Sequence, residues 1–463
     1  MTNVITTINP ATGQALNTYE AWTPEQVDGA VELAHSAALA WGKQPLEVRV
    51  AAVRRLAVQL RAQKDKFAAL VTTEMGKPLA EAAGEMEKSA VTAIYYADNA
   101  TRLLSDEPAS IEGVDAWVSY EPMGLVLAVM PWNFPVWQVM RFAIPSLVAG
   151  NGILLKHSPN VTGSALALEQ LMADAGLPAH LLTTLVVAEP EVPQTIDRLI
   201  NDDRIAAVTL TGSNRAGAAV GAAAGRASKR SVLELGGSDA FVVLDDADVV
   251  TAAAAAVKAR FHNAGQSCVC AKRFIVAQSV AEEFTRLFVK GTRALNIGNP
   301  TDPATQVGPL ARGDLRDALT RQVEQSVAAG AKLLAGGNAV EGPGYFFELT
   351  VVANTGPGMA VFDEETFGPV AAIAIAKDDA DAIRLANSSQ FGLSLSIWTA
   401  STARGIAVAK KITSGAAFIN AASASDARLP FGGTKKSGYG RELAAAGVRE
   451  FCNIRTYWAA KTN

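Results

Sequence analysis

Cysteine, histidine and long apolar runs are all scarce in this chain. Its 463 residues include three cysteines and four histidines, too few for a disulfide-rich secreted scaffold or a histidine-rich metal centre. No unbroken apolar run reaches the length of about 18 residues that indicates a transmembrane helix. The opening MTNVITTINPATGQAL lacks the basic and apolar blocks of a signal peptide. We therefore expect a soluble cytoplasmic protein with no membrane partner.

An excess of charge of one sign is missing as well. The formal net charge is -4, and charged residues make up 19% of the chain, without the basic stripe that a nucleic-acid surface requires. Nearly half of the residues are apolar, and a chain of this length can build two or three domains with large cores. We expect a globular protein that binds no nucleic acid.

The spacing of apolar residues changes along the chain. From Pro24 to Leu104 they recur every three and four residues, as in AAVRRLAVQLRAQKDKFAALV, which is typical of helices. Farther on, short apolar runs such as GLVLAVMP and GILLKH end at breaker residues, as buried parallel strands do, and helical stretches separate them. This alternation predicts an α/β fold with an open parallel sheet, and a second α/β segment follows residue 237.

Two of the three cysteines stand two positions apart in NAGQSCVC, residues 263–270. A disulfide across so short a span is strained, and a zinc site needs two further ligands that the scattered histidines do not supply. Cys268 follows an expected helix and precedes the strand RFIVA, a position that suits a nucleophile. A buried structural cysteine and a Cys–His pair stay open as alternatives.

Polar residues follow several of the other expected strands. In LELGG, Glu234 stands among apolar residues, and burial raises the pKa of a carboxyl toward that of a general base. In MPWNFP, two prolines hold Asn133 in a rigid turn, where its amide can stabilise an oxyanion or hold its own backbone. A strand-end carboxylate that faces solvent or caps a helix is the alternative for Glu234.

Two more motifs suit a nucleotide, although each is weak alone. In TLTGSNRAG a strand passes through a glycine turn into a helix whose N-terminus can bind phosphate, without the G-x-G-x-x-G pattern. In EETFGPV, Glu365 can hold a sugar hydroxyl or belong to a surface turn.

In this order, the motifs resemble the aldehyde dehydrogenase superfamily, from NPATGQ (9–14) to PFGGTKKSGYGRE (430–442). Within it, the chain is most similar to the shorter bacterial NAD(P)-dependent succinate-semialdehyde dehydrogenases. The resemblance implies an aldehyde dehydrogenase fold of class α/β with three parts. These are a Rossmann-like cofactor domain (1–110 and 125–235), an α/β catalytic domain (236–430) and a small β oligomerisation element (111–124 and 445–463). An exposed strand edge in such an element implies a homodimer or homotetramer.

The resemblance also implies roles for single residues. Cys268 is similar to the nucleophile that forms a thiohemiacetal with a small aldehyde. Asn133 and the Cys268 backbone N–H resemble the donors that form the oxyanion hole of the family. Glu234 resembles the base that activates water for thioester hydrolysis. Contacts to NAD or NADP are implied for Trp132, Lys156, Ser158, Gly212, Ser213, Glu365 and Phe367. No metal is implied.

Departures from the family pattern bear on cofactor and substrate. Many NAD-preferring relatives carry, three residues after Lys156, a Glu that would repel a 2′-phosphate; this chain has Pro159 there. We therefore expect both NAD and NADP to be accepted. Substrate-binding positions are implied for Gln138, Arg141, His262 and Ser425, and an arginine occupies the Arg141 position in succinate-semialdehyde relatives.

A positive, hydrogen-bonding tunnel favours an aldehyde with a distal carboxylate, so we expect oxidation of succinate semialdehyde. His262 departs from relatives with arginine there, so another small polar aldehyde stays open, as does an unrelated ion pair for Arg141. A coenzyme-A-acylating enzyme, a cysteine hydrolase and a non-catalytic scaffold are the competing functions. Cys270 is either a packing neighbour or the partner in a reversible Cys268–Cys270 disulfide.

Overall fold

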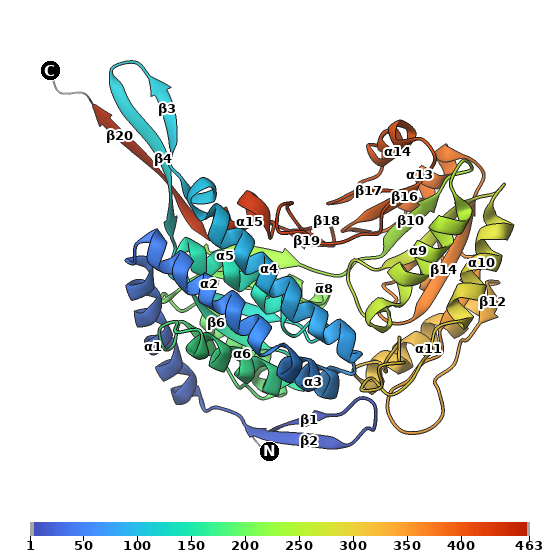
Figure 1. The fold of residues 1–463 in the computed structure, drawn as a ribbon, viewed down its shortest axis with the longest axis horizontal. Coiled ribbons are helices and arrows are strands. Elements are labelled where there is room, and N and C mark those ends of the chain that lie inside the picture. Colours follow the sequence, from blue (N-terminus) through green and yellow to red (C-terminus); the bar gives the residue numbers. More distant parts are fainter. Residues whose placement is uncertain (1–3, 461–463) are drawn as a thin grey trace.

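A six-stranded sheet forms the first of two α/β lobes in the computed structural model, which describes residues 4–460 (Figure 1). The strand order is β19-β9-β8-β5-β6-β7, and β5 to β9 are parallel. The strands are β5 (Leu125–Met130), β6 (Gly152–His157), β7 (Leu182–Thr184), β8 (Ile205–Thr211), β9 (Arg230–Glu234) and β19 (Gly438–Tyr439). The order reverses between β5 and β8, and open parallel sheets bind ligands at the carboxyl ends of strands beside such a reversal.

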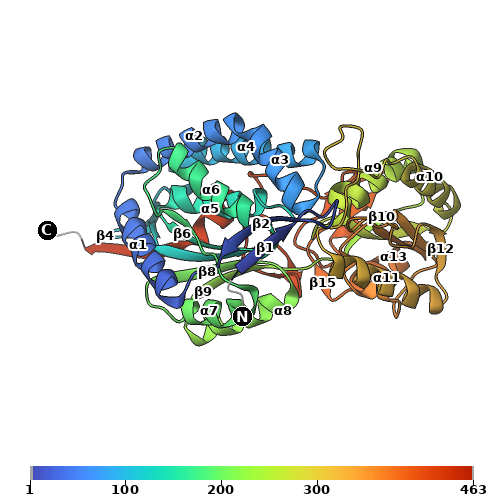
Figure 2. The same ribbon diagram turned by 90° about the horizontal axis from the view of Figure 1, so that it is seen from below.

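Helices cover both faces of this sheet, because alternate strand residues point to opposite sides (Figure 2). Val126 and Ala128 of β5 join the core with one group of helices, and Leu125 and Leu127 join the core with the other. The first group is α2 (Leu46–Ala62), α3 (Lys64–Met75), α4 (Leu79–Leu104), α5 (Trp137–Ala149) and α6 (Thr162–Asp174). The second is α1 (Pro24–Gly42), α7 (Val192–Ile200) and α8 (Asn214–Arg226).

The second lobe contains a seven-stranded sheet in the order β12-β13-β14-β11-β10-β16-β17, in which only β12 is antiparallel to its neighbour. The strands are β10 (Asp239–Val243), β11 (Ala271–Ala277), β12 (Lys332–Ala335), β13 (Thr350–Ala353), β14 (Val370–Ala376), β16 (Leu395–Trp398) and β17 (Phe418–Ile419). One face packs on α9 (Val249–Phe261) and α10 (Ala281–Arg293). The other packs on α11 (Gly313–Ala328), α12 (Ala360–Asp363), α13 (Asp379–Asn387) and α14 (Thr402–Ala409).

A three-stranded antiparallel arm projects from the first lobe (Figure 1). It contains β3 (Glu107–Ile111), β4 (Val114–Pro122) and β20 (Cys452–Ala460), and α15 (Ala444–Arg449) leads into it. Two small pairs complete the strands: β1 (Val4–Ile8) with β2 (Ala15–Glu20), and β15 (Phe391–Gly392) with β18 (Thr434–Lys435). Short 3₁₀ turns are η1 (Pro159–Val161), η2 (Glu189–Glu191) and η3 (His262–Gly265).

The predicted α/β class and the helical region from Pro24 to Leu104 are confirmed, since that region folds into α1 to α4. The domain limits stay predictions. The expected limit after residue 235 falls between β9 and β10, whereas β3 starts before the expected limit at residue 111 and pairs within the arm. The expected C-terminal strand is β20 as far as Ala460, and residues 461–463 lie outside the described range. Within residues 4–460, no helix is long and apolar enough to cross a membrane.

Candidate active site

A cavity of about 250 Å³ lies between the two lobes, at the carboxyl ends of β5 and β8. Its lining includes eight of the residues singled out in the sequence: Trp132, Asn133, Gln138, Gly212, Ser213, Cys268, Glu365 and Phe367. They come from segments that together span more than 200 residues of the chain. The strand reversal beside β5 places those of the first lobe at one edge of its sheet, where this class of fold binds ligands. Cys268, Glu365 and Phe367 reach the same cavity from the second lobe.

The loop that carries Cys268 runs from η3 to β11 and has an unusual backbone. Asn263, Ala264 and Gly265 have φ angles of 54°, 52° and 72°. A side chain at Gly265 would clash with the carbonyl oxygen of Gly368, so glycine is required there for both φ and space. The loop is therefore held in one tight conformation beside the cavity.

Hydrogen bonds between side-chain amides and backbone carbonyls fasten this loop to the first lobe. Asn133 Nδ2 donates to the Gln266 carbonyl at 3.1 Å. Asn263 Nδ2 donates to the carbonyls of Asn133 at 2.9 Å and Gln266 at 3.0 Å. An amide nitrogen has two N–H groups, so Asn133 keeps one N–H for a ligand while the other orients the group.

Burial governs the ionisation of Cys268. It raises the pKa of the thiol to about 12, although the positive charges of Arg141 and Lys272 act in the opposite direction. The resting nucleophile is therefore a thiol at neutral pH. All three cysteines lie in the described range and are free thiols. Cys270 is buried and donates to the carbonyls of Ser267 at 3.0 Å and Gly265 at 3.3 Å.

Glu234 ends β9 and is 2% exposed. Neither of its carboxylate oxygens has a hydrogen-bond partner within residues 4–460. Burial raises its pKa well above the usual range, the nearby carboxylate of Glu442 raises it further, and Arg141 and Arg441 oppose the shift. A buried carboxyl without fixed partners is free to hold and release a proton.

Arg141 lies on α5, one helical turn after Gln138, and is 2% exposed. Its guanidinium forms an ion pair with Glu442, donates to Thr211 Oγ1 at 3.4 Å and stacks over the Phe431 ring at 4.5 Å. The ion pair left open by the sequence is therefore present. The role of Arg141 toward substrate stays a prediction, supported by its electrostatic contact with Cys268.

Ser425 contacts a residue that the sequence analysis missed. Lys88 on α4 donates through Nζ to Ser425 Oγ at 2.6 Å, and its ammonium lies 4.4 Å from the centre of the Trp137 ring. Burial and the charge of Arg141 lower the pKa of Lys88 to about 8, against the opposing effects of Glu85 and Asp426. Helical spacing in GEMEKSA could have placed Lys88 one turn beyond Glu85, but the Ser425 contact joins segments 337 residues apart.

His262 lies at the start of η3 and stacks on the Phe134 ring, with centroids 6.1 Å apart. Its Nε2 is 3.8 Å from Glu81 Oε1. Although the His262 side chain is 47% exposed, desolvation by the surrounding protein, followed by the charges of Lys77 and Lys88, lowers its pKa to about 4. The imidazole is therefore neutral near pH 7 and acts as a hydrogen-bonding group rather than a cation.

A second cavity, of about 770 Å³, adjoins Ser158 and Pro159 after β6. Lys156, at the end of β6, is 6% exposed, and burial lowers its pKa to about 8 although Glu189 acts in the opposite direction. Glu189 and Glu191 line this cavity too, so acidic groups are present nearby despite the proline at 159. The sequence analysis missed both, because they follow β7 rather than β6.

The residues around the two cavities fit a dinucleotide. Ser213 begins α8 and its Oγ accepts the Ala216 N–H at 3.3 Å, which presents a helix N-terminus to the smaller cavity. The rings of Trp132 and Phe367 meet edge to face at 5.6 Å. Arg312 lines both cavities, which suits a ligand that extends from one to the other.

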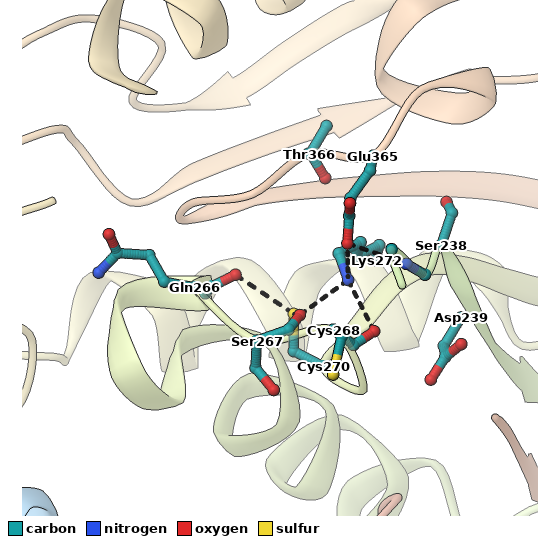
Figure 3. Close-up of polar contacts among 12 residues, drawn as sticks. Ser238, Asp239, Gln266, Ser267, Cys268, Cys270, Lys272, Glu365 and Thr366 are labelled. Carbon is teal, nitrogen blue, oxygen red and sulfur yellow. Dashed lines mark hydrogen bonds and ion pairs between the residues drawn. The ribbon is translucent and has the colours of Figure 1, made fainter. Parts of the chain in front are cut away.

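Glu365 and Lys272 meet beside the nucleophile loop (Figure 3). Glu365 Oε1 accepts the Gly237 N–H at 2.9 Å and lies 3.5 Å from Lys272 Nζ. A side chain at Gly236 would clash with Glu365, so the glycine pair allows this carboxylate its close approach to the backbone. The sequence analysis identified Glu365 but not Lys272.

Comparisons with known proteins agree with this geometry. Residues 1–457 match the family model described as Aldehyde dehydrogenase family. The chain is 48% identical over 451 residues to the NAD(P)+ succinate semialdehyde dehydrogenase Sad of Escherichia coli K12, covering 97% of each chain. It is 45% identical to the NADP(+) succinate-semialdehyde dehydrogenase 1 of Mycobacterium tuberculosis H37Rv, covering 98% of this chain and 100% of the relative.

Solved structures of other proteins superpose on nearly the whole of this chain. The succinic semialdehyde dehydrogenase of Streptococcus pyogenes, determined in complex with NADP+, superposes with a TM-score of 0.95 at 37% identity, covering 99% of this chain and 100% of that one. The protein Gox0499 gives a TM-score of 0.95 at 38% identity, covering 98% and 99%. The resemblance and the fold predicted from the motifs are confirmed.

Proposed function

Because the chain belongs to the aldehyde dehydrogenase family, we propose that it oxidises succinate semialdehyde to succinate with NAD or NADP. The observation that carries this proposal is the cavity that brings Cys268, Asn133 and Glu365 together. The names of its relatives support the substrate and both cofactors. The remaining steps follow from the side chains around that cavity.

Cys268 is the proposed nucleophile. Its thiol releases a proton to solvent, and the sulfur forms a bond to the aldehyde carbon as the carbonyl electron pair moves to oxygen. The Asn133 amide and the Cys268 backbone N–H are the proposed donors to that oxyanion. A bound nicotinamide supplies the acceptor for the hydride that leaves this carbon, and the substrate remains on Cys268 as a thioester.

Glu234 is the proposed base for the second half of the reaction. As a carboxylate it takes a proton from water, whose oxygen attacks the thioester carbon, and the carbon–sulfur bond breaks to release the acid and Cys268. Its raised pKa makes it an effective proton acceptor. An acylating enzyme that transfers the thioester to coenzyme A does not need this base, so Glu234 favours hydrolysis.

The proposed site for the distal carboxylate lies around Lys88, Arg141 and Ser425. Lys88 donates to Ser425, and its charge interacts with that of Arg141, which in turn interacts with Cys268. Two cations and a hydroxyl favour a carboxylate over an uncharged chain end. Gln138 lines the cavity beside Cys268, and the charge of Lys88 acts on His262 and lowers its pKa.

Use of both cofactors is proposed from the charges around the larger cavity. Lys156 and Arg312 favour a 2′-phosphate, while Glu189 and Glu191 oppose one. The proposed contacts to NAD or NADP are those of Trp132, Lys156, Ser158, Gly212, Ser213, Glu365 and Phe367. A preference beyond about a thousandfold for either cofactor in kcat/KM, roughly 4 kcal/mol, would contradict this proposal.

Absorbance at 340 nm tests the function directly. Purified protein is given succinate semialdehyde or butyraldehyde, each with NAD and with NADP. We expect reduction of both cofactors, with a kcat/KM for succinate semialdehyde at least about tenfold higher than for butyraldehyde, because a charge-assisted hydrogen bond contributes about 1.5–3 kcal/mol. Absence of any cofactor reduction would favour a cysteine hydrolase or a non-catalytic scaffold instead.

The assembly and location belong to the same proposal. The arm of β3, β4 and β20 leaves an edge strand that supports a homodimer or homotetramer. Three free thiols are consistent with a reducing compartment such as the cytoplasm.

A further inference from the structure

Lys272 is a fully buried lysine at the start of β11 to which the proposed reaction gives no role so far. Its side chain is 0% exposed. The ammonium donates to the carbonyl oxygens of Ser267 at 2.8 Å and Cys268 at 3.0 Å, and it faces Glu365 at 3.5 Å (Figure 3). One cation therefore contacts both the nucleophile loop and the carboxylate proposed to hold the nicotinamide ribose.

The contact with Ser267 reaches the oxyanion hole through a single peptide group. The Ser267 carbonyl and the Cys268 N–H belong to the same amide, and a donor on the carbonyl polarises the N–H and makes it a stronger donor. A charged donor has a larger effect than a neutral one. Cys270 also donates to the Ser267 carbonyl, so this oxygen is held from two sides.

The surroundings keep Lys272 charged in spite of its burial. Burial alone lowers its pKa, but Cys270, Glu365 and Asp239 together raise it above the usual value. The cation Arg260 acts in the opposite direction and donates to Cys270 Sγ at 3.0 Å. A positive charge is therefore maintained against the peptide that carries the proposed oxyanion donor.

We propose that Lys272 is a positioning residue that strengthens the Cys268 N–H as an oxyanion donor and fixes Glu365 for the nicotinamide ribose. The proposal rests on the proposed function of Cys268 and Glu365. A lysine that only neutralises Glu365 and Asp239 would have a different signature, because it would affect cofactor binding or stability without changing attack by the sulfur.

An ester substrate separates these roles. p-Nitrophenyl acetate acylates a cysteine through an oxyanion but needs no hydride acceptor, so its rate reports on Cys268 and its donors alone. For Lys272→Met we expect ester acylation to fall at least about tenfold, together with a raised KM for NAD and NADP. Glu365→Gln should raise the KM for NAD and NADP as Lys272→Met does, which assigns the effect on cofactor binding to this carboxylate.

Two further variants serve as controls for the loss of a lysine and for misfolding. Lys435 also donates to two backbone carbonyls, those of Asn387 at 3.3 Å and Ser389 at 3.1 Å, so Lys435→Met is the matched control and should keep both activities. Lys272→Gln retains a neutral donor and is measured as well, in case Lys272→Met does not fold. It should reduce ester acylation in the same direction, and thermal denaturation reports whether each variant is folded.

The outcomes distinguish this inference from the proposed function. Unchanged ester acylation in folded Lys272→Met or Lys272→Gln would overturn the role in the oxyanion hole. An unchanged cofactor KM would overturn the link to Glu365. If the unaltered protein hydrolyses the ester but oxidises no aldehyde, the proposed function fails while the effect of Lys272 on ester acylation can still be measured.

Discussion

At the scale of single residues, burial favours the neutral form of both Cys268 and Glu234. The pKa of Cys268 is raised to about 12, and that of Glu234 is raised well above its usual range. The proposed reaction needs the thiolate and the carboxylate. Both groups must therefore lose a proton that the protein interior favours, and the rate depends on pH through these two side chains.

The raised pKa values of Cys268 and Glu234 determine how kcat should depend on pH. A raised pKa means that the active, deprotonated form gains population as pH rises, so kcat should increase from pH 6 to pH 9 instead of levelling off near the ordinary carboxyl range. Steady-state rates of NADPH formation at saturating aldehyde and cofactor measure this. A rate that is flat over this interval would show that neither group ionises in the slow step.

Glu234→Gln separates the two halves of the reaction. The amide matches the carboxylate in shape but cannot accept a proton, so we expect one turnover of NADPH at a near-normal rate and then a steady state about 10²–10⁴-fold slower, the usual range for loss of a general base. Stopped-flow absorbance resolves the burst. A normal steady state would assign water activation to another group.

Lys88 carries the charge that is most sensitive to pH in the proposed carboxylate site. Lys88→Met should raise the KM for succinate semialdehyde at least about tenfold, the value of a charge-assisted hydrogen bond, and leave that for butyraldehyde unchanged. Its pKa of about 8 reflects burial, Arg141, Glu85 and Asp426. In the unaltered enzyme the KM for the acid aldehyde alone should therefore rise above pH 8. Equal changes for both aldehydes would remove Lys88 from substrate recognition.

At the scale of elements, one carboxylate determines where α5 begins. Glu85 Oε2 on α4 accepts the backbone N–H groups of Val136 and Trp137 at 3.1 and 3.0 Å, and its other oxygen is ion-paired with Lys77. All these groups are buried. Because α5 also carries Gln138 and Arg141, this cap fixes one wall of the proposed substrate site.

Glu85→Ala tests the strength of that cap. Removing one partner of a buried ion pair takes from Lys77 the carboxylate it contacts directly, and lowers the free energy of unfolding by about 3–5 kcal/mol. The midpoint of thermal denaturation should therefore fall by several degrees. Glu87→Ala, on the same helix, removes an exposed pair with Arg61 and should change stability by no more than about 1 kcal/mol. Similar shifts for both variants would contradict the proposed importance of the cap.

The sequence was sufficient to predict the α/β alternation of elements and eight of the residues that line the smaller cavity. Apolar runs bounded by breakers mark β5 and β6, and helical spacing marks α1 to α4. Lys88, Lys272 and Glu189 were missed because what identifies them is a contact, not a pattern. Lys88 is 337 residues from Ser425, and the charge of Lys272 matters only because a loop carbonyl lies 2.8 Å away.

At the scale of the whole molecule, the arm displays apolar side chains to solvent. Ile454 and Trp458 of β20 are 56% and 62% exposed. β20 and β3 are the outer strands of the three-stranded sheet. Exposed apolar residues on an outer strand are typical of a surface that pairs with another chain.

The double variant Ile454→Asp, Trp458→Asp tests assembly through the arm. Charges at both positions should prevent a second copy from packing there, so the apparent mass from light scattering should fall toward 48.3 kDa. An exposed Val58→Asp substitution on α2, where valine is 63% exposed, is the control and should leave the mass unchanged. A double variant of unaltered mass would place the interface elsewhere.

Two side-chain hydrogen bonds join the lobes where the carbonyl of the substrate would lie: Asn133 donates to the Gln266 carbonyl, and Asn263 donates to the Asn133 carbonyl. A hinge motion that separated the lobes would break these hydrogen bonds. The proposed oxyanion hole would then have to form again in every turnover. We therefore expect substrate binding and product release to proceed without large hinge motion between the lobes.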